Sequence, residues 1–393
     1  MYIRRQDRVG DSQFVSGWQF EDRFILGGAG NSSASITNGM KEANLANPNI
    51  TWYKVMTTNV GLDGSFWGGK LSFEFDYFYR KTTGYPATRN TSLPTTSGIP
   101  LPQENLNSSD NRGFELSLGT VQRIGNVNLQ IKGNVAYARE KDLYKEQALP
   151  LNQYKNWRDN GAYRWKNVTW GYEHIGQFQS YDEIYNSPIQ DGKGNSSLRP
   201  GDIKYKDLNG DGLIDANDEK VIGKGTFPDL NFGLTLAADW KGFDVNILFQ
   251  GASNYTQVLN ALTSPFRGPG EGNGFRVWMD SWHKADYNDP DSEWVPGKFP
   301  SLRIEGNDNN SKKSTYWTTD AYYVRLKAIE IWYTMAKNLL SKVCIEHMRV
   351  YANAYDPLTI TNVKYTDTEA RQGWQRFYYP QLKLYSFCVN VRF

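Results

Sequence analysis

The last nine residues of the chain alternate between apolar and polar positions. The apolar set is Tyr385, Phe387, Val389, Val391 and Phe393, and the polar set is Ser386, Cys388, Asn390 and Arg392. A period of two places the sets on opposite faces of a β-strand, and a tilted strand needs about 9 to 11 residues to cross a bilayer. The pattern predicts a membrane-spanning strand, although an edge strand of a soluble sheet would also show it.

Four further runs share this alternation. Their apolar positions are Leu71, Phe73, Phe75, Tyr77 and Tyr79; Val127, Leu129, Ile131, Val135 and Tyr137; Leu230, Phe232, Leu234, Leu236 and Trp240; and Phe243, Val245, Ile247 and Phe249. Lipid-facing and lumen-facing residues of an outer-membrane barrel alternate in this way. The recurrence therefore favours a transmembrane β-barrel over a single edge strand.

The connections between the candidate strands alternate in length. Short ones are expected at 64–68, 124–126, 241–242 and 335–345, and long ones at 81–112, 140–229, 253–318 and 357–380. Transmembrane barrels have short periplasmic turns and longer extracellular loops. Counted from a first strand near 52–62, this arrangement gives nine strands and leaves Phe393 at the periplasmic side.

Composition supports spanning by strands. Hydrophobic residues make up 39% of the chain, the mean hydropathy is -0.64, and no stretch approaches the roughly 18 apolar residues of a membrane helix. Aromatic residues make up 15%, which suits the aromatic girdles of a barrel but also other all-β and sugar-binding proteins. The net charge of +2 gives no electrostatic case for a nucleic-acid partner.

The N-terminal sequence predicts a partial barrel. Residues 1–9, MYIRRQDRV, lack the apolar core of a secretory signal peptide, and nothing indicates a plug domain. Nine strands, or eleven if 14–26 contributes a pair, are not expected to close on their own. We expect the C-terminal portion of a longer protein; the alternative is a small barrel of its own.

A calcium-type loop lies at 207–218, within the longest connection. The ligand set is Asp207, Asn209, Asp211, the carbonyl of Leu213, Asp215 and Asp218, at loop positions 1, 3, 5, 7, 9 and 12. Hard oxygen ligands at this spacing, with a glycine at position 6, are typical of calcium loops. Position 12 departs from the usual Glu, and the flanks are not clearly helical. The expected cofactor is a structural Ca²⁺; the alternative is that these residues only form turns.

Enzymatic function finds little support. The three histidines, His174, His283 and His347, are far apart, with no zinc-type pairing. The loop acids Asp286, Asp289, Asp291 and Glu293 leave a two-carboxylate glycosidase open, but acidic residues among Asn, Pro and Ser usually form solvated loops. We predict no catalytic residues, with a secreted calcium-stabilised carbohydrate-binding module and a calcium-dependent glycosidase as the alternatives.

Several segments together resemble one known family. They are PGDIKYKDLNGDGLID at 200–215, NPNITW at 47–52 leading to NVGLD at 59–63, FDYFYRKTT at 75–83, NRGFELSL at 111–118, YYVRLK at 322–327, and YP at 379–380 before the last strand. In this order they resemble SusC/RagA-type TonB-linked outer-membrane proteins, from about Gly27 onward. After YYVRLK the apolar positions slip by one residue, so a β-bulge near Ala328 is expected.

The resemblance implies the following. The fold would be an all-β, antiparallel transmembrane barrel, with residues 1–393 forming about 9–11 strands of a 22-stranded barrel whose plug is absent from this chain. The location would be the cell outer membrane, in contact with its lipid. The partners would be a SusD-type lipoprotein lid, TonB through the missing N-terminal part, and an oligosaccharide or peptide substrate. The function would be nutrient import.

Overall fold

The computed structural model describes most of the chain. The described residues are 18–26, 35–42, 47–89, 101–148, 150, 152–259, 262, 275–303, 308–336, 340, 345–369 and 381–393. The chain divides into two compact units: the first comprises Met1–Val60, Asp76–Phe114 and Ala138–Lys166, and the second comprises Gly61–Phe75, Glu115–Tyr137 and Asn167–Phe393.

One nine-stranded antiparallel sheet dominates the fold. In pairing order its strands are β17 (Leu384–Arg392), β16 (His347–Thr361), β15 (Thr318–Thr334), β12 (Phe243–Val258), β11 (Leu230–Trp240), β6 (Val127–Tyr144), β5 (Gln103–Ile124), β4 (Leu71–Thr88) and β3 (Lys54–Phe66). Each strand of this sheet pairs with the long strand that precedes or follows it along the chain. Among the described residues no pairing joins β17 to β3, so the sheet is open, as predicted.

The remaining elements are short. The strands are β1 (Trp18–Leu26), β2 (Ser35–Glu42), β7 (Val168–Gly171), β8 (His174–Gln177), β9 (Ile203–Tyr205), β10 (Lys220–Lys224), β13 (His283–Lys284) and β14 (Trp294–Val295). The helices are α1 (Gln153–Asp159), α2 (Tyr181–Tyr185) and α3 (Asp308–Ser311), with 3₁₀ turns η3 (Ala216–Asp218) and η4 (Arg276–Asp280). Among the described residues, no helix is long and apolar enough to cross a membrane.

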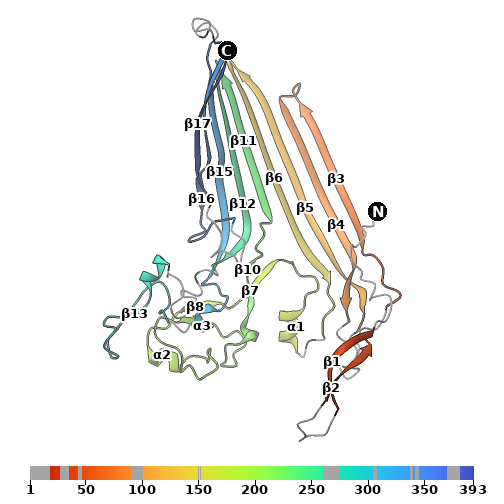
Figure 1. Cartoon of the computed structure of the whole chain (residues 1–393), viewed down its shortest axis with the longest axis vertical. Coiled ribbons are helices and arrows are strands. Elements are labelled where there is room, and N and C mark those ends of the chain that lie inside the picture. The colour runs from red at the N-terminus through yellow and green to blue at the C-terminus, as the bar shows by residue number, and fades with distance from the viewer. Residues whose placement is uncertain are drawn as a thin grey trace. The chain divides into compact units, whose positions relative to one another are not determined.

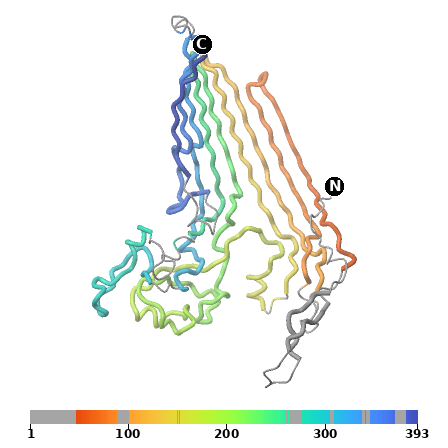
Figure 2. Tube along the Cα trace, viewed as in Figure 1, coloured from red at the N-terminus to blue at the C-terminus, as the bar shows by residue number. Residues whose placement is uncertain are grey.

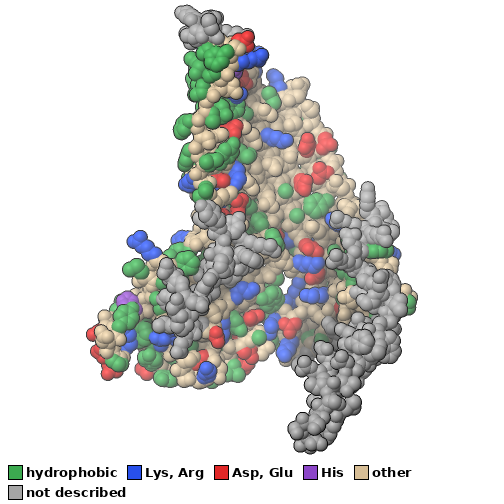
Figure 3. Space-filling view, in the orientation of Figure 1, with side chains coloured by type: hydrophobic (Ala, Val, Ile, Leu, Met, Phe, Trp, Pro, Cys, Tyr) green, Lys and Arg blue, Asp and Glu red, His purple; other side chains and the backbone are tan. Residues whose placement is uncertain are grey.

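The strand register keeps the apolar set together. Leu234 of β11 lies opposite Phe249 of β12 and opposite Gly133 of β6. Because directly opposite residues share a face of an antiparallel sheet, one face is a continuous apolar surface and the other carries polar pairs such as Asn128 with Asp239. Hydrophobic side chains are visible along the β15–β17 edge in Figure 3. This is the two-sided pattern that the alternation predicted.

The second unit places its long connections at one end. Strands β11, β12, β15, β16 and β17 lie side by side in Figures 1 and 2, with the C-terminus at one end and the segments around β7–β10, α2 and α3 at the other. The short connections between strands lie at 67–70, 125–126, 241–242 and 335–346; of the last, 337–339 and 341–344 lie outside the described residues. Three of these agree with prediction to within about a residue, and the first lies three residues late.

All four long connections were predicted to begin too early, at 81, 140, 253 and 357, whereas the preceding strands end at Thr88, Tyr144, Val258 and Thr361. The first differs most. The connection expected at 81–112 spans only 89–102, because β4 continues to Thr88 and β5 begins at Gln103. A strand that extends beyond the bilayer faces water or polar groups on both sides, so its sequence loses the apolar alternation. The polar residues 103–112 therefore read as loop although they pair as strand.

The predicted β-bulge is confirmed. Leu248 lies opposite Ala328, and the next residue of β12, Phe249, lies opposite Leu326, so Lys327 is the extra residue. The bulge restores the facing of the apolar side chains on either side of it. The extra strand pair predicted at 14–26 is not found among the described residues. Trp18–Leu26 is a single strand, β1, and it pairs with β2 (Ser35–Glu42) in a sheet separate from the nine-stranded one; residues 14–17 lie outside the described part.

Candidate functional site

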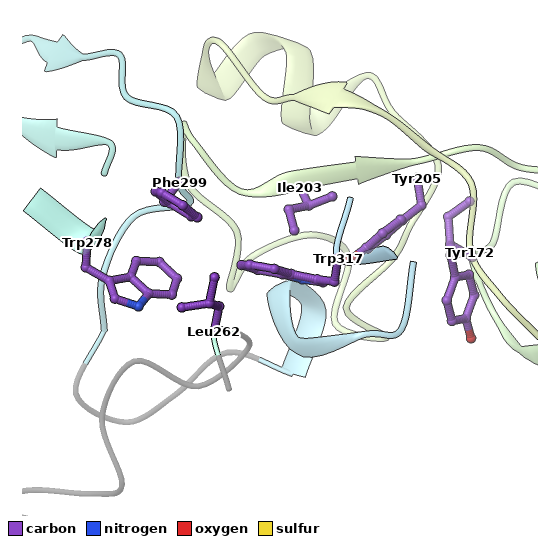
Figure 4. Close-up of a cluster of buried hydrophobic side chains, with 8 residues drawn as sticks. Tyr172, Ile203, Tyr205, Leu262, Trp278, Phe299 and Trp317 are labelled. Carbon is purple, nitrogen blue, oxygen red and sulfur yellow. The ribbon is translucent and has the colours of Figure 1, made fainter. Parts of the chain in front are cut away.

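The connections of the second unit fold around their own core. We call residues 168–224, 262, 275–303 and 308–317 the loop body. Its core residues are Tyr172, Ile203, Tyr205, Ile214, Leu262, Trp278, Phe299 and Trp317. Figure 4 shows Trp317 in the middle of this cluster. The centroid of its ring lies 6.2 Å from that of Trp278 and 6.5 Å from that of Phe299. Burial of this many large aromatic rings holds the loop body in a defined conformation.

The segment Pro200-Gly201-Asp202 is at the centre of this packing. Gly201 has a φ of +90°, and a Cβ at this position would overlap the side chain of Trp282. Both the backbone angle and the close approach of the indole require glycine here. Packing against Trp282 therefore explains the glycine of the PGD motif at 200–202.

Asp202 is a fully buried carboxylate that is saturated with partners. It forms an ion pair with Arg303, accepts a hydrogen bond from Nδ2 of Asn310 at 2.8 Å, and accepts another from the backbone N–H of Arg199 at 3.0 Å. A buried charge is tolerated only when it is paired and hydrogen-bonded in this way. Asp202 is structural, which leaves no role for it as a catalytic acid.

Helix α3 extends the same network. Nε2 of Gln190 donates to the carbonyl of Ile203 at 2.6 Å and to Oδ1 of Asn309 at 2.9 Å. The hydroxyl of Tyr205 donates to the carbonyl of Asn309 at 2.7 Å, and burial raises the pKa of Tyr205 well above its usual value. The sequence analysis missed this network, because nothing in the spacing links the Asn pair to residues a hundred positions earlier.

The calcium-type loop is ordered by its own hydrogen bonds. The Asp207 carboxylate accepts from the backbone N–H groups of Gly210 at 2.7 Å and Gly212 at 2.9 Å. Oδ1 of Asp211 accepts from the N–H of Leu213 at 2.9 Å. Gly210 and Gly212 have φ values of +75° and +80°, so the sharp turn predicted at the glycine positions is present.

The end of this loop is closed by Asp218. This side chain is fully buried and accepts from the N–H groups of Leu208 at 2.8 Å and Asp215 at 2.9 Å. In the described part of the chain, no three His, Cys, Asp or Glu side chains form a group that could hold a metal ion. The oxygen donors have the chemistry that Ca²⁺ prefers, and calcium binding stays a prediction.

Several aromatic, acidic and histidine side chains of the loop body have structural roles. Trp278 and Trp282 are only 6% and 4% exposed, so they pack the loop body and are not available to stack on a sugar ring. Oδ1 of Asp286 and of Asp289 each accept a backbone N–H two residues later, which is a turn geometry. His174 bonds Thr315, with 2.7 Å between Nδ1 and Oγ1, and burial lowers its pKa.

An open hollow lies near η4 in the loop body. Its volume is about 600 Å³, and its lining includes Phe275, Arg276, Met279, His283 and Tyr287. The ring of Tyr287 stacks on that of His283 with centroids 6.2 Å apart.

Comparison with known proteins places the chain in a class. No protein-family model matches it. Two TonB-dependent receptors of Formosa agariphila are 25% and 24% identical over 100% of the chain and 41% of their own length. The TonB-dependent receptor SusC of Bacteroides thetaiotaomicron is 23% identical over 88% of the chain and 32% of its own length. The chain thus spans about two-fifths of the length of the first of these relatives.

Solved structures agree on the fold. The RagAB peptide importer in its open-open state has a TM-score of 0.65 and 20% identity, covering 98% of this chain and 38% of that one. In the closed-closed state the TM-score is 0.61. The chain is therefore a homologue of SusC/RagA-type TonB-dependent receptors, and its open sheet corresponds to a portion of their barrel. The relatives are named as TonB-dependent receptors, which agrees with the predicted outer-membrane location and with the prediction of no enzymatic activity.

Proposed function

We propose that the protein carrying this chain imports nutrients across the outer membrane, driven by TonB. This chain supplies nine strands of the barrel wall and a folded extracellular loop body. The observation that carries the proposal is the open nine-stranded sheet with one apolar face, combined with similarity to TonB-dependent receptors along the whole chain. Neither a secreted binding module nor a glycosidase requires such a sheet.

The substrate class we propose is an oligosaccharide or a peptide. SusC is among the relatives, and the RagAB structures are described as a peptide importer. The test is growth of the native bacterium, with the gene deleted or restored, on single defined oligosaccharides or peptides as the limiting nutrient. Import predicts loss of growth on one nutrient class with recovery on complementation. Unchanged growth on every glycan and peptide would contradict the proposal.

The proposed partners follow from the same relatives. A SusD-type lipoprotein would cap the extracellular side, and TonB would act through a plug domain outside this chain. Affinity purification of the full-length protein from outer membranes, with the TonB-binding segment intact or deleted, tests both. We expect a lipoprotein to co-purify in either case, and uptake to require the TonB-binding segment.

We further propose that Ca²⁺ bound at 207–218 has a structural role. The loop lies directly after β9, whose residues Ile203 and Tyr205 belong to the loop-body core. Leu213 also forms an isolated bridge with Ile189. A cation at this point would fix the loop to the core of the loop body.

A further inference from the structure

Three cations surround one indole ring in the first unit. The guanidinium of Arg139 lies 4.4 Å from the ring centroid of Trp165, that of Arg112 lies 5.7 Å away, and the ammonium of Lys141 lies 5.8 Å away. Asp110 pairs with Arg112 at 2.6 Å. With three cations and one carboxylate, these side chains around Trp165 carry a net charge of +2. We call them the Trp165 cluster.

The cluster faces the lipid side of the sheet. Lys141 pairs with Trp165 in an antiparallel bridge, and opposite residues share a face. The next residue, Lys166, points the other way and pairs with Glu140 at 2.7 Å. Counted along β6 with a period of two, positions 139 and 141 continue the series that runs from Val127 to Tyr137. That series is the apolar, lipid-facing set.

The position along the strand corresponds to the lipid headgroups. From Val127 to Tyr137 is a rise of about 34 Å at roughly 3.4 Å per residue. At a strand tilt of about 40° this covers about 26 Å of membrane depth, which matches the apolar band of roughly 25 Å on such barrels. Arg139 and Lys141 follow directly beyond the band, on the extracellular side.

The adjoining segment has the composition of a membrane interface. Residues 152–166 contain four basic residues and one acidic one, a net charge of +3. Trp157 and Tyr163 are 56% and 71% exposed, and helix α1 has no buried residue. Exposed Trp and Tyr together with Lys and Arg are typical of segments that lie at the membrane surface.

We propose that the Trp165 cluster and segment 152–166 bind the phosphate groups of anionic glycolipids in the outer leaflet. Guanidinium groups bind phosphate in a bidentate manner. The ammonium of Lys141 lies over the rings of Tyr163 and Trp165, and Nε of Arg112 is buried without a hydrogen-bond partner. A phosphate beside the ring would neutralise the excess charge while the glycolipid chains cover the apolar band. This inference rests on the proposed placement in the outer membrane.

The test uses the full-length protein purified from outer membranes. Binding of the lipopolysaccharide of the same membrane, intact or enzymatically dephosphorylated, is measured by fluorescence titration in detergent. The double variant Arg139→Gln/Lys141→Gln removes two cations of the cluster. The control Lys132→Gln removes a cation from the opposite face of the same strand, where Lys132 lies opposite Thr235.

We expect the double variant to bind intact lipopolysaccharide roughly tenfold more weakly than wild type, since basic residues near an anionic surface each contribute severalfold. The control variant should bind as wild type does, and dephosphorylated lipid should bind wild type as weakly as intact lipid binds the double variant. Heat-modifiable migration on gels confirms that each barrel is assembled.

Three outcomes would overturn the proposal. The first is equal affinity of wild type for intact and dephosphorylated lipid. The second is equal loss in the control and the double variant. The third is loss of the co-purifying lipoprotein with lipid affinity unchanged, which would mean that the cluster contacts a protein. If the growth test fails while lipid binding is intact, the proposal of import is contradicted and the proposal of lipid binding is not.

Discussion

The guanidinium of Arg325 is paired with the carboxylate of Glu369 at 2.8 Å, which fastens the segment after β16 to strand β15. Arg325 is 3% exposed, and its Nη2 also bonds Thr368 at 3.1 Å. A buried cation with several acceptors is strongly coupled to each of them. The YYVRLK motif therefore has a structural reason: its arginine orders the loop that follows the next strand.

Substitution Arg325→Met should release that loop. Removing one member of a buried ion pair costs about 3 to 5 kcal/mol, because it leaves the partner charge unpaired. We expect protease cleavage within 362–369 in intact cells, with the barrel still assembled. The matched control is Lys327→Met, because Lys327 pairs with Asp356 at 3.1 Å and is more exposed. Its cost should be about 1 kcal/mol or less, and equal cleavage in both variants would contradict the role assigned to Arg325.

Substitution Gly201→Ala should disrupt the loop body. The added methyl group would overlap Trp282 at a φ of +90°, so both strain and collision oppose it. The matched control is Gly192→Ala, where φ is +70° but nothing lies within 4 Å of a Cβ. Only the control should retain wild-type protease resistance in the loop body, at a cost of about 1 kcal/mol. Resistance of both variants would mean that the contact with Trp282 is not limiting.

The sheet was predictable because the alternation of apolar and polar residues is set within each strand. A strand with one face in lipid alternates at every second residue, and even the bulge at Lys327 left a trace as a phase slip before Ile329. The ends of β4 and β5 were not predictable in this way. Beyond the bilayer neither face of these strands contacts lipid, so their residues do not alternate between apolar and polar.

The loop body was much less predictable. The sequence indicated the calcium-type loop, because its ligands lie within twelve residues. It did not indicate that Asp202, Arg303 and Asn310 meet, since these contacts join segments about a hundred residues apart. A buried polar network depends on tertiary packing, and no periodicity reports it.

Substitution Leu234→Arg tests the lipid face. Leu234 lies in the middle of β11, on the apolar face opposite Phe249, where an arginine near the bilayer midplane costs about 2 to 4 kcal/mol. The matched control is Ala237→Arg, which points to the polar face beside Gln130 and Asn246. We expect only Leu234→Arg to lower the yield of assembled barrel and its unfolding free energy in urea. Similar losses in the two variants would mean that β11 does not have one lipid-exposed face.

Calcium should protect the loop at 207–218 from proteolysis. Because Asp207 also orders the turn through Gly210 and Gly212, alanine at this position would loosen the loop with or without a metal. We therefore choose Asp211→Asn, which removes a charge and keeps an acceptor. Calorimetry should detect calcium binding to wild type and at least about tenfold weaker binding to the variant.

The calcium experiment has its own control and contrary outcome. Asp289→Asn lies in a separate acidic turn, where Oδ1 accepts the N–H of Asp291 at 2.9 Å, and should bind calcium as wild type does. Chelator should increase cleavage at 207–218 in wild type only. If wild type shows no heat of binding and its cleavage is unchanged by chelator, the hypothesis of calcium binding at 207–218 is rejected.

Acid should loosen the turn at 187–198 through Asp191. Burial opposes ionisation of this carboxylate, but the hydroxyl of Ser197 and the backbone N–H groups of Ser197, Lys193 and Asn195 outweigh it and lower its pKa to about 2 from 3.8. Because the folded-state pKa is depressed, the stabilisation is complete above about pH 4 and is lost as pH falls through 2.

Discounted for solvent screening, that shift corresponds to about 1 kcal/mol at neutral pH. We expect pepsin to cleave 187–198 of wild type more readily at pH 2 than at pH 4, when compared with an acid-insensitive reference peptide. Asp191→Asn should already be cleaved readily at pH 4, with little further change on acidification. The control Asp286→Asn lies in another turn and should leave cleavage at 187–198 as in wild type. Identical pH profiles for wild type and Asp191→Asn would show that another group controls the acid sensitivity of this turn.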